Sequence, residues 1–140
     1  MIIVDTNVLS ELMRVPPATA VMDWFAAQHA TSLYTTAISE AEIYYGIELL
    51  PKGRRREQLR KAADSMFAED FANRVLGFDS DAARAFSTIA ALRRSAGRPI
   101  SYADAQILAI ARSHSAKVAT RNTADFEGCG VDLLDPWRRT

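Results

Sequence analysis

The stretch Ile2-Ile3-Val4-Asp5-Thr6-Asn7 decides the fold class, because a buried strand ends there at an acid. Its first three residues are apolar and β-branched, as expected of a strand that is covered on both faces. Helical spacing follows at once, since Leu9, Leu12 and Met13 recur on one face. Pro16-Pro17 then ends this helix. The chain therefore opens with a buried strand and a helix, which is typical of α/β proteins.

Strands and helices continue to alternate along the rest of the chain. Apolar or β-branched runs predict further strands, at 33–36, 75–78, 117–120 and 131–134. Apolar spacing and capping residues predict more helices, at about 21–28, 39–50, 54–73, 79–97 and from 101 onward. This alternation predicts a three-layer α/β/α fold with a central, mostly parallel sheet and helices on both faces. Because no repeat or long linker divides the 140 residues, we expect one domain over 1–140.

Charge and cysteine content restrict the functional classes. Basic residues number 17 and acidic residues 17, so binding to a polyanion must come from local patches rather than from net charge. Cys129 has no second cysteine to pair with, which favours a reducing compartment and a structural role. The opening apolar run stops at Asp5, and no stretch is long enough to cross a bilayer. We therefore expect a cytoplasmic protein with no membrane partner.

Four acids fall where such a sheet has its functional crevice, beyond the carboxyl ends of the strands. Asp5 ends the first strand, and Glu42 is expected in the first turn of the helix after the second strand. Asp104 is expected in the first turn of the helix before the 117–120 strand, and Asp125 follows that strand by five residues. We therefore expect all four carboxylates at the same edge of the sheet.

Clustered carboxylates without histidine or cysteine partners predict a site for a hard cation. Several carboxylates cannot all stay ionised at close range unless a cation neutralises them. Ligands that are all oxygen favour Mg²⁺, with Mn²⁺ as an alternative. A hard cation beside an open crevice suits hydrolysis of a phosphodiester.

Each acid also has a plain structural interpretation. Ser39-x-x-Glu42 and Ser101-x-x-Asp104 both match the pattern in which a serine caps a helix and the acid returns the hydrogen bond. Asp5 could begin a turn, and Asp125 could be an ordinary loop acid. Separate caps need not share one edge of the sheet, so the convergence of the four acids favours the metal site.

These motifs, in this order and at these spacings, resemble the PIN domain, and more narrowly the VapC toxins of type II toxin–antitoxin pairs, in the FitB branch. The resemblance covers nearly the whole chain. It rests on Val4-Asp5-Thr6-Asn7, the Ser39–Glu42 helix start, the Asp104 helix, Thr120–Phe126 and Pro136-Trp137.

The resemblance implies a Mg²⁺-dependent endoribonuclease toxin that cuts RNA and is neutralised by a cognate antitoxin of the VapB or FitA type. It implies that Asp5, Glu42 and Asp104 hold the metal and that Asp125 completes the acidic pocket. The polar residues expected to orient these acids are Thr6, Asn7, Thr120 and Asn122. It also implies a homodimer. The aromatic-rich surface of the second and third helices is expected to form either the dimer contact or the antitoxin groove, and its core or interface aromatics are Trp24, Phe25, Tyr44 and Tyr45.

Basic and histidine residues receive more modest interpretations. Arg98 and Arg121 are the candidate RNA contacts, because each adjoins a motif that builds the crevice. The run Lys52, Arg54, Arg55 and Arg56 is expected to be largely a solvated helix face. His29 and His114 lack acidic or serine neighbours at useful spacing and are taken as structural. Glu11 is expected to be an exposed acid on the first helix.

Two other protein classes are excluded because the acids that they need at the first strand are absent. A haloacid-dehalogenase-like phosphatase needs a second acid where this chain has Asn7, and a response-regulator receiver needs an acidic pair at the first strand. The remaining alternative is a weakly active or inactive partner-binding module in a DNA-binding toxin–antitoxin repressor, where the antitoxin supplies the DNA contacts. Because all four acids are present, an active ribonuclease is favoured over this alternative.

Overall fold

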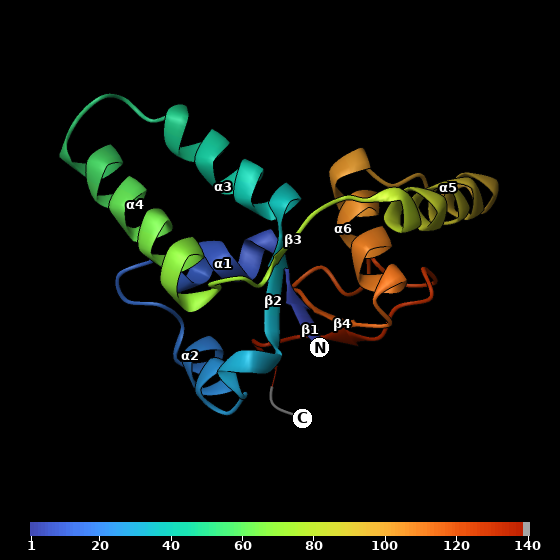
Figure 1. Cartoon of the computed structure of the whole chain (residues 1–140), viewed down its shortest axis with the longest axis horizontal. Helices are drawn as coiled ribbons and strands as arrows, with labels where there is room; N and C mark the ends of the chain where they lie inside the picture. Colours follow the sequence, from blue (N-terminus) through green and yellow to red (C-terminus); the bar gives the residue numbers. More distant parts are fainter. Residues whose placement is uncertain (139–140) are drawn as a thin grey trace.

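The computed structural model describes residues 1–138 and contains a central five-stranded sheet with helices on both faces (Figure 1). Its spatial order is β3-β2-β1-β4-β5, and every neighbouring pair is parallel. The strands are β1 (Ile2–Val4), β2 (Leu33–Thr36), β3 (Val75–Leu76), β4 (Lys117–Ala119) and β5 (Leu133–Leu134). The predicted α/β fold is confirmed, although β3 and β5 are shorter than their sequence patterns suggested.

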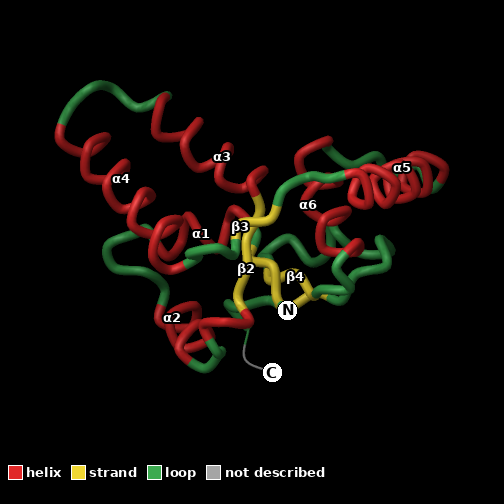
Figure 2. The backbone as a smooth tube through the Cα atoms, viewed as in Figure 1, coloured by secondary structure: helices red, strands yellow, loops and turns green. Residues whose placement is uncertain are grey.

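The helices form two layers, one on each face of the sheet (Figures 1 and 2). One face carries the first four, which are α1 (Thr6–Leu12), α2 (Thr19–Ala26), α3 (Ala37–Glu48) and α4 (Arg54–Ser65). The other face carries α5 (Ser80–Ser95) and α6 (Tyr102–Ser113). Short turns of 3-10 and π type, Ala30–Ser32 and Met66–Asp70, precede β2 and follow α4. The π turn takes up part of the predicted 54–73 helix, so α4 ends earlier than expected.

The alternating side chains of β1 divide the apolar residues into two cores. Ile3 packs with α5 and α6 residues such as Ile89 and Ile107, whereas Val4 packs with α1 and the π turn, including Leu9 and Phe71. Both Ile3 and Val4 have no exposed surface. This explains why β1 is apolar without alternation: each of its faces is covered by a helical layer.

The start of α3 differs from the sequence interpretation. Thr36, the last residue of β2, is the N-cap, and its hydroxyl accepts a hydrogen bond from the Ser39 amide at 3.1 Å. The prediction that Ser39 opens this helix is therefore wrong, and Glu42 lies in the second turn rather than the first. The expected reciprocal cap between Ser39 and Glu42 does not form. At α6 the prediction was correct, because the Ser101 hydroxyl accepts from the Asp104 amide at 3.2 Å.

Glu11 is buried, and the prediction that it is exposed is wrong. Only 6% of its surface is accessible. One carboxylate oxygen accepts from the Ala18 amide at 3.2 Å and the other lies 3.3 Å from the Arg14 guanidinium. Ala18 is the N-cap residue of α2 and offers no side-chain oxygen, so Glu11 supplies from α1 the acceptor that this helix start needs.

Within residues 1–138, every helix is too short or too polar to span a bilayer.

Candidate active site

The strand order places a crevice beyond the carboxyl ends of β1 and β4. The chain moves from β1 outward through β2 and β3 and then returns to the opposite side of β1 to form β4. Adjacent parallel strands whose connections leave in opposite directions open a gap at their carboxyl ends. Asp5 follows β1 and Thr120 follows β4, so both residues lie at this position.

Asp5 is fixed by contacts from both flanking segments. Its amide donates to the Ala119 carbonyl at 2.9 Å, which continues the pairing of β1 with β4 by one residue. One carboxylate oxygen accepts from the Thr6 amide at 2.7 Å, and the other accepts from the Thr120 hydroxyl at 2.7 Å. Asp5 is only 3% exposed and also serves as the N-cap of α1. Its carboxylate therefore has a defined position and orientation.

Thr120 is the centre of a small polar network around Asp5. Besides donating to Asp5, its hydroxyl oxygen accepts from the Asn122 amide at 3.1 Å and from the Asn7 side-chain nitrogen at 3.3 Å. The Asn7 side-chain oxygen accepts from the Arg121 amide at 3.3 Å. Asn7 thus joins the start of α1 to the segment after β4, and Asn122 contributes through its backbone.

Glu42 reaches the site from α3 and contacts Thr6. The Thr6 hydroxyl lies 2.8 Å from a Glu42 carboxylate oxygen and 2.8 Å from the Ser39 hydroxyl. A threonine hydroxyl has one hydrogen, so it donates to the carboxylate and accepts from Ser39. Ser39 is fully buried whereas Glu42 is exposed to solvent. Ser39, which does not cap α3, therefore helps to hold Glu42 toward α1 through its contact with Thr6.

Asp104 and Asp125 approach from the other helical layer. Asp104 is half-buried in the first turn of α6, and Asp125 is an exposed residue in the loop after β4. Burial raises the pKa of Asp104, the Ser101 contact opposes the rise, and the charge of Asp125 adds to it. The last effect shows that these two carboxylates lie close enough to repel each other.

Burial raises the pKa of Asp5 from 3.8 to about 6. The hydrogen bonds from Thr120 and Thr6 oppose this rise, and the charges of Asp104 and Glu42 increase it. The carboxylates of Asp104 on α6 and Glu42 on α3 therefore repel that of Asp5, and the carboxylate of Asp125 repels that of Asp104. The structure brings all four predicted acids into one electrostatic cluster, drawn from four separate parts of the chain.

The cluster has the donor chemistry of a hard-cation site but not a closed coordination shell. In the part of the chain that the structure describes, no three acidic, histidine or cysteine side chains converge closely enough to hold one ion as they stand. The donors are carboxylate oxygens, which suit Mg²⁺ or Mn²⁺. Burial is the main cause of the raised pKa values of Asp5 and Asp104, and repulsion from the neighbouring carboxylates adds a smaller part, which a bound cation would relieve.

The arginines predicted to contact RNA also make contacts within the protein, and so does one arginine of the basic run. Arg98 donates to the Ala124 carbonyl at 3.1 Å, and the Arg121 guanidinium lies 4.8 Å from the centre of the Trp137 ring. In the basic run, Arg56 pairs with Glu48 at 2.7 Å, while Arg54 and Arg55 are exposed. Arg98 and Arg121 thus lie beside the acidic cluster but also stabilise the loops that surround it.

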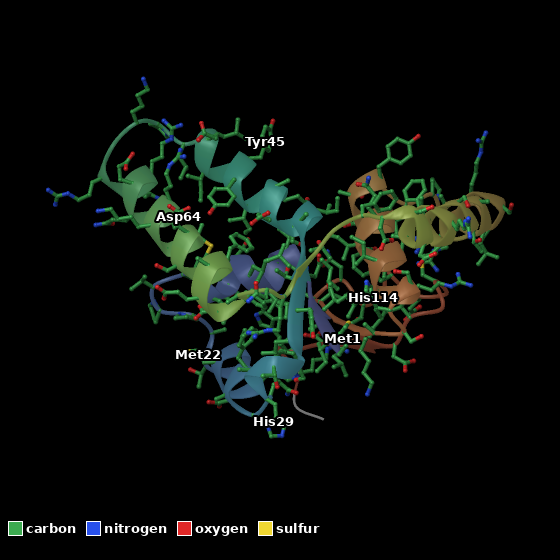
Figure 3. All side chains as sticks on the ribbon, viewed as in Figure 1. Met1, Met22, His29, Tyr45, Asp64 and His114 are labelled. Carbon is green, nitrogen blue, oxygen red and sulfur yellow. The ribbon has the colours of Figure 1, made fainter. Side chains whose placement is uncertain are left out.

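Both histidines, labelled in Figure 3, lie in segments that lead into the amino ends of strands, whereas Asp5 follows the carboxyl end of β1. His29 precedes the short turn before β2, and His114 follows α6 shortly before β4. Sequence reasoning missed one residue near the site, Arg93, which is 7% exposed and donates at 2.6 Å to the Asp125 carbonyl. A signal was available, because Arg93 continues the inward stripe of Phe86 and Ile89 along α5.

The family model for the PIN domain matches residues 2–128, nearly the whole chain. This chain is a member of the PIN-domain family.

Three curated relatives align with this PIN domain over 137 residues, covering 98% of the chain and at least 98% of each relative. They are the plasmid stability protein StbB of Pseudomonas syringae pv. tomato (42% identical), the VapC ribonuclease Y4jK of Sinorhizobium fredii (40%) and the toxin FitB of Neisseria gonorrhoeae (35%). The chain therefore spans the full length of relatives named as a ribonuclease and as a toxin.

A solved structure of FitAB bound to a DNA fragment contains a chain with the same fold. The two chains superpose with a TM-score of 0.93 at 34% sequence identity, covering 100% of this chain and 98% of the other. The agreement covers the whole length of this chain and is not confined to the acidic motifs. The identification of this PIN domain therefore does not depend on short motifs alone.

Proposed function

We propose that this PIN domain is a metal-dependent endoribonuclease toxin that hydrolyses RNA phosphodiester bonds and is neutralised by a cognate antitoxin. The observation that carries the proposal is the convergence of Asp5, Glu42, Asp104 and Asp125 at the carboxyl edge of a parallel sheet. The electrostatic coupling of these acids supports it. Full-length similarity to a named VapC ribonuclease and a named toxin supports it independently.

In this proposal Asp5, Glu42 and Asp104 hold Mg²⁺, or Mn²⁺, and Asp125 completes the pocket. The cation would stabilise the negative charge that develops on the scissile phosphate. Thr6 and Thr120 hold the Asp5 carboxylate in one orientation, which favours a defined position for the cation. Thr6 also orients Glu42, which is otherwise an exposed side chain on α3.

The exposed edge of the acidic site favours an RNA strand over a small, compact substrate. Glu42 and Asp125 are exposed at the edge of the site, whereas Asp5 is buried at its base. Such an open, acid-lined edge admits a polymer that passes across it. Arg98 and Arg121 lie at the same edge and are proposed as phosphate contacts, each while holding its own loop.

We propose that a row of three neighbouring cavities, which ends at Thr6 and Glu42, is the place for the antitoxin. A cavity of about 930 Å³ lies among α1, α2 and the end of α4. It shares Met13 and Arg14 with a second cavity of about 470 Å³. That cavity shares Met13 and Arg55 with a third, of about 270 Å³, which reaches Glu42 and Thr6. The three cavities therefore form one path from α2 to the acids.

The lining of this path specifies its occupant. Apolar side chains such as Phe25, Met66 and Phe71 line the far end, where Glu69, Asp70 and Arg74 also lie. Toward the acidic site the charged lining residues are Arg14 and Arg55, which would face acidic side chains of the peptide. A peptide with apolar and acidic side chains complements this surface. At the near end, a basic residue of the same peptide would face the carboxylates. An antitoxin tail that follows this path would cover the acidic site.

The proposed homodimer needs a surface other than the full aromatic set expected from the sequence. Trp24 and Phe25 are half-buried and pack edge-on with each other, and Tyr44 is half-buried against Phe67. Tyr45, labelled in Figure 3 on α3, is 67% exposed. The α3 surface around Tyr45 is therefore the proposed contribution to a dimer. DNA binding is proposed to come through the antitoxin; the FitAB complex, which contains a chain with this fold, is solved bound to a DNA fragment.

The proposal is tested by incubating the purified chain with single-stranded or looped RNA in Mg²⁺, in EDTA, and in EDTA with Mg²⁺ restored. We expect internal cleavage that disappears with EDTA and returns with Mg²⁺. The RNA ends that appear after brief induced expression would identify the substrate in cells. A chain that binds its antitoxin but leaves all RNA intact under these conditions would instead be a partner-binding module of a repressor.

A further inference from the structure

Arg93 is a buried cation whose hydrogen bonds go to the backbone on both sides of the acidic site. It lies near the end of α5 and is 7% exposed. Its Nε donates to the Arg98 carbonyl at 2.7 Å, and its Nη1 donates to the Asp125 carbonyl at 2.6 Å. Burying a guanidinium is costly unless its donors are satisfied, so a residue placed here must make these contacts well.

The loop after Asp125 curls around this guanidinium. Nη1 also lies 3.5 Å from the Glu127 carbonyl and 3.5 Å from the Cys129 sulfur. Gly128 and Gly130 have φ values of +75° and +74°, a conformation that glycine adopts without strain and that allows the tight turn. Phe126 is fully buried in the core beneath the loop. The backbone around Asp125 is therefore anchored by Phe126 and by Arg93.

The other contact of Arg93 leads to Asp104. The Arg98 carbonyl belongs to the short connection that ends at Ser101, the N-cap of α6, and Asp104 lies in the first turn of this helix. One planar guanidinium thus joins the segment that opens the Asp104 helix to the segment that carries Asp125. Arg98 adds a parallel contact between the same two segments by donating to the Ala124 carbonyl.

We infer that Arg93 is a positioning residue of the acidic site, which holds the Asp104 and Asp125 segments at a fixed separation through their backbones. The inference rests on the proposed function for its consequence, because the separation matters when both carboxylates serve one cation. The geometric part concerns the loop alone and can be tested without any nuclease assay. Nothing in the side-chain chemistry of the four acids reveals this role.

The test compares Arg93→Met and Arg93→Lys with Ile89→Val. Methionine fills the same space without donors, and lysine keeps the charge but cannot donate from two edges of a planar fork. Ile89 lies one turn earlier on α5 and is 1% exposed in the same core, so its valine variant controls for weakened packing of this helix. Two quantities are measured on folded protein: hydrogen exchange of the amides of residues 122–128 without metal, and Mn²⁺ affinity by calorimetry.

We expect Arg93→Met to exchange these amides at least about tenfold faster and to bind Mn²⁺ about tenfold more weakly, in the range typical of residues that support metal ligands. Arg93→Lys should recover part of both losses, and Ile89→Val should change neither by more than about twofold. If Arg93→Met matches Ile89→Val in both measurements, the inference is wrong. Should the methionine variant not fold, a lysine variant that equals wild type in both would overturn it. Absence of RNA cleavage by wild type would refute the proposed function, while faster exchange in Arg93→Met would still support the positioning role.

Discussion

The hydroxyl of Thr120 donates to the Asp5 carboxylate at 2.7 Å and so joins the ends of β4 and β1 across 115 residues of sequence. The same oxygen accepts from the Asn122 amide and the Asn7 side chain. Thr120 is completely buried. This single hydroxyl therefore connects the deepest acid of the site to the two segments that surround it.

Replacing Thr120 by valine should lower both stability and metal affinity. The change removes a buried hydrogen bond to the Asp5 carboxylate and the acceptor of the partly buried Asn122 amide bond, which should cost about 1–3 kcal/mol in the free energy of unfolding. It also removes a hydrogen bond that lowers the pKa of Asp5, so this pKa should rise further and Mn²⁺ binding should weaken by about tenfold. Denaturant unfolding and calorimetry measure the two effects. Thr120→Ser keeps the hydroxyl and should restore both; equal behaviour of the valine and serine variants would refute this role.

The metal-free protein should lose stability as pH rises because of Asp5. Its pKa in the folded state, about 6, is above the ordinary value of 3.8, so the folded state binds the proton more tightly than the unfolded state does. The resulting stabilisation is complete below pH 3.8 and is lost as pH rises through about 6. The loss amounts to about 3 kcal/mol.

This pH dependence is measured by denaturant unfolding in EDTA from pH 4 to 7.5, with Asp5→Asn as the comparison. The difference in unfolding free energy between the two proteins should move in favour of the variant as pH rises. Addition of Mn²⁺ at pH 7.5 should stabilise wild type more than Asp5→Asn, since binding to the folded state raises its stability. A difference that stays constant with pH would show that the Asp5 carboxyl does not titrate as described.

Glu42→Gln distinguishes a functional acid from a structural one. Thr36 caps α3 and Glu42 lies in the second turn, so helix content and melting temperature should change little. If Glu42 is a metal ligand, RNA cleavage should fall by about a hundredfold, because the barrier rises by several kcal/mol when a coordinating charge is lost. Glu40→Gln, two residues earlier on α3, is the control and should stay near wild type. Unchanged cleavage by Glu42→Gln would remove Glu42 from the proposed site.

Charge reversal at Arg55 tests the row of cavities proposed for the antitoxin. Arg55 lines the two cavities nearest the acids, whereas its exposed neighbour Arg54 lines none of the three that form the path. Arg55→Glu should weaken antitoxin binding about tenfold or more through repulsion of an acidic peptide, and Arg54→Glu should have a much smaller effect. Calorimetry with the proposed cognate antitoxin measures both. Equal effects of the two variants would mean that the antitoxin binds elsewhere.

The main features of the fold could be predicted because local sequence patterns determine them. The apolar run of β1 and the alternation of strands with helices were sufficient for a parallel sheet, and the parallel sheet was sufficient to place Asp5, Asp104 and Asp125 at one edge. The start of α3 was not predictable in the same way, because Thr36 is both the end of a strand and a helix cap. Two overlapping local signals gave the wrong boundary.

Glu11 and Arg93 escaped prediction for a different reason. Glu11 accepts from an amide that lies beyond Pro16-Pro17, and Arg93 donates to a carbonyl 32 residues away. In both cases the partner is a backbone group, which every residue carries, so no residue type in the sequence marks the contact. The helical spacing along α5 could have indicated that Arg93 faces inward, but its backbone partners are identified only when the fold is known.

The most direct test of the nuclease is cleavage by Asp5→Asn compared with Asp23→Asn. Asparagine keeps the shape of the side chain and can still accept from the Thr6 amide, but it removes one charge from the deepest position of the acidic site. Asp23 is an exposed acid on α2 and is the matched control. With single-stranded RNA and Mg²⁺, we expect Asp5→Asn to cleave at least about a hundredfold more slowly than wild type and Asp23→Asn to cleave normally. If wild type and Asp5→Asn are equally inert on RNA, yet equally toxic in cells, the protein is not a nuclease that acts through Asp5.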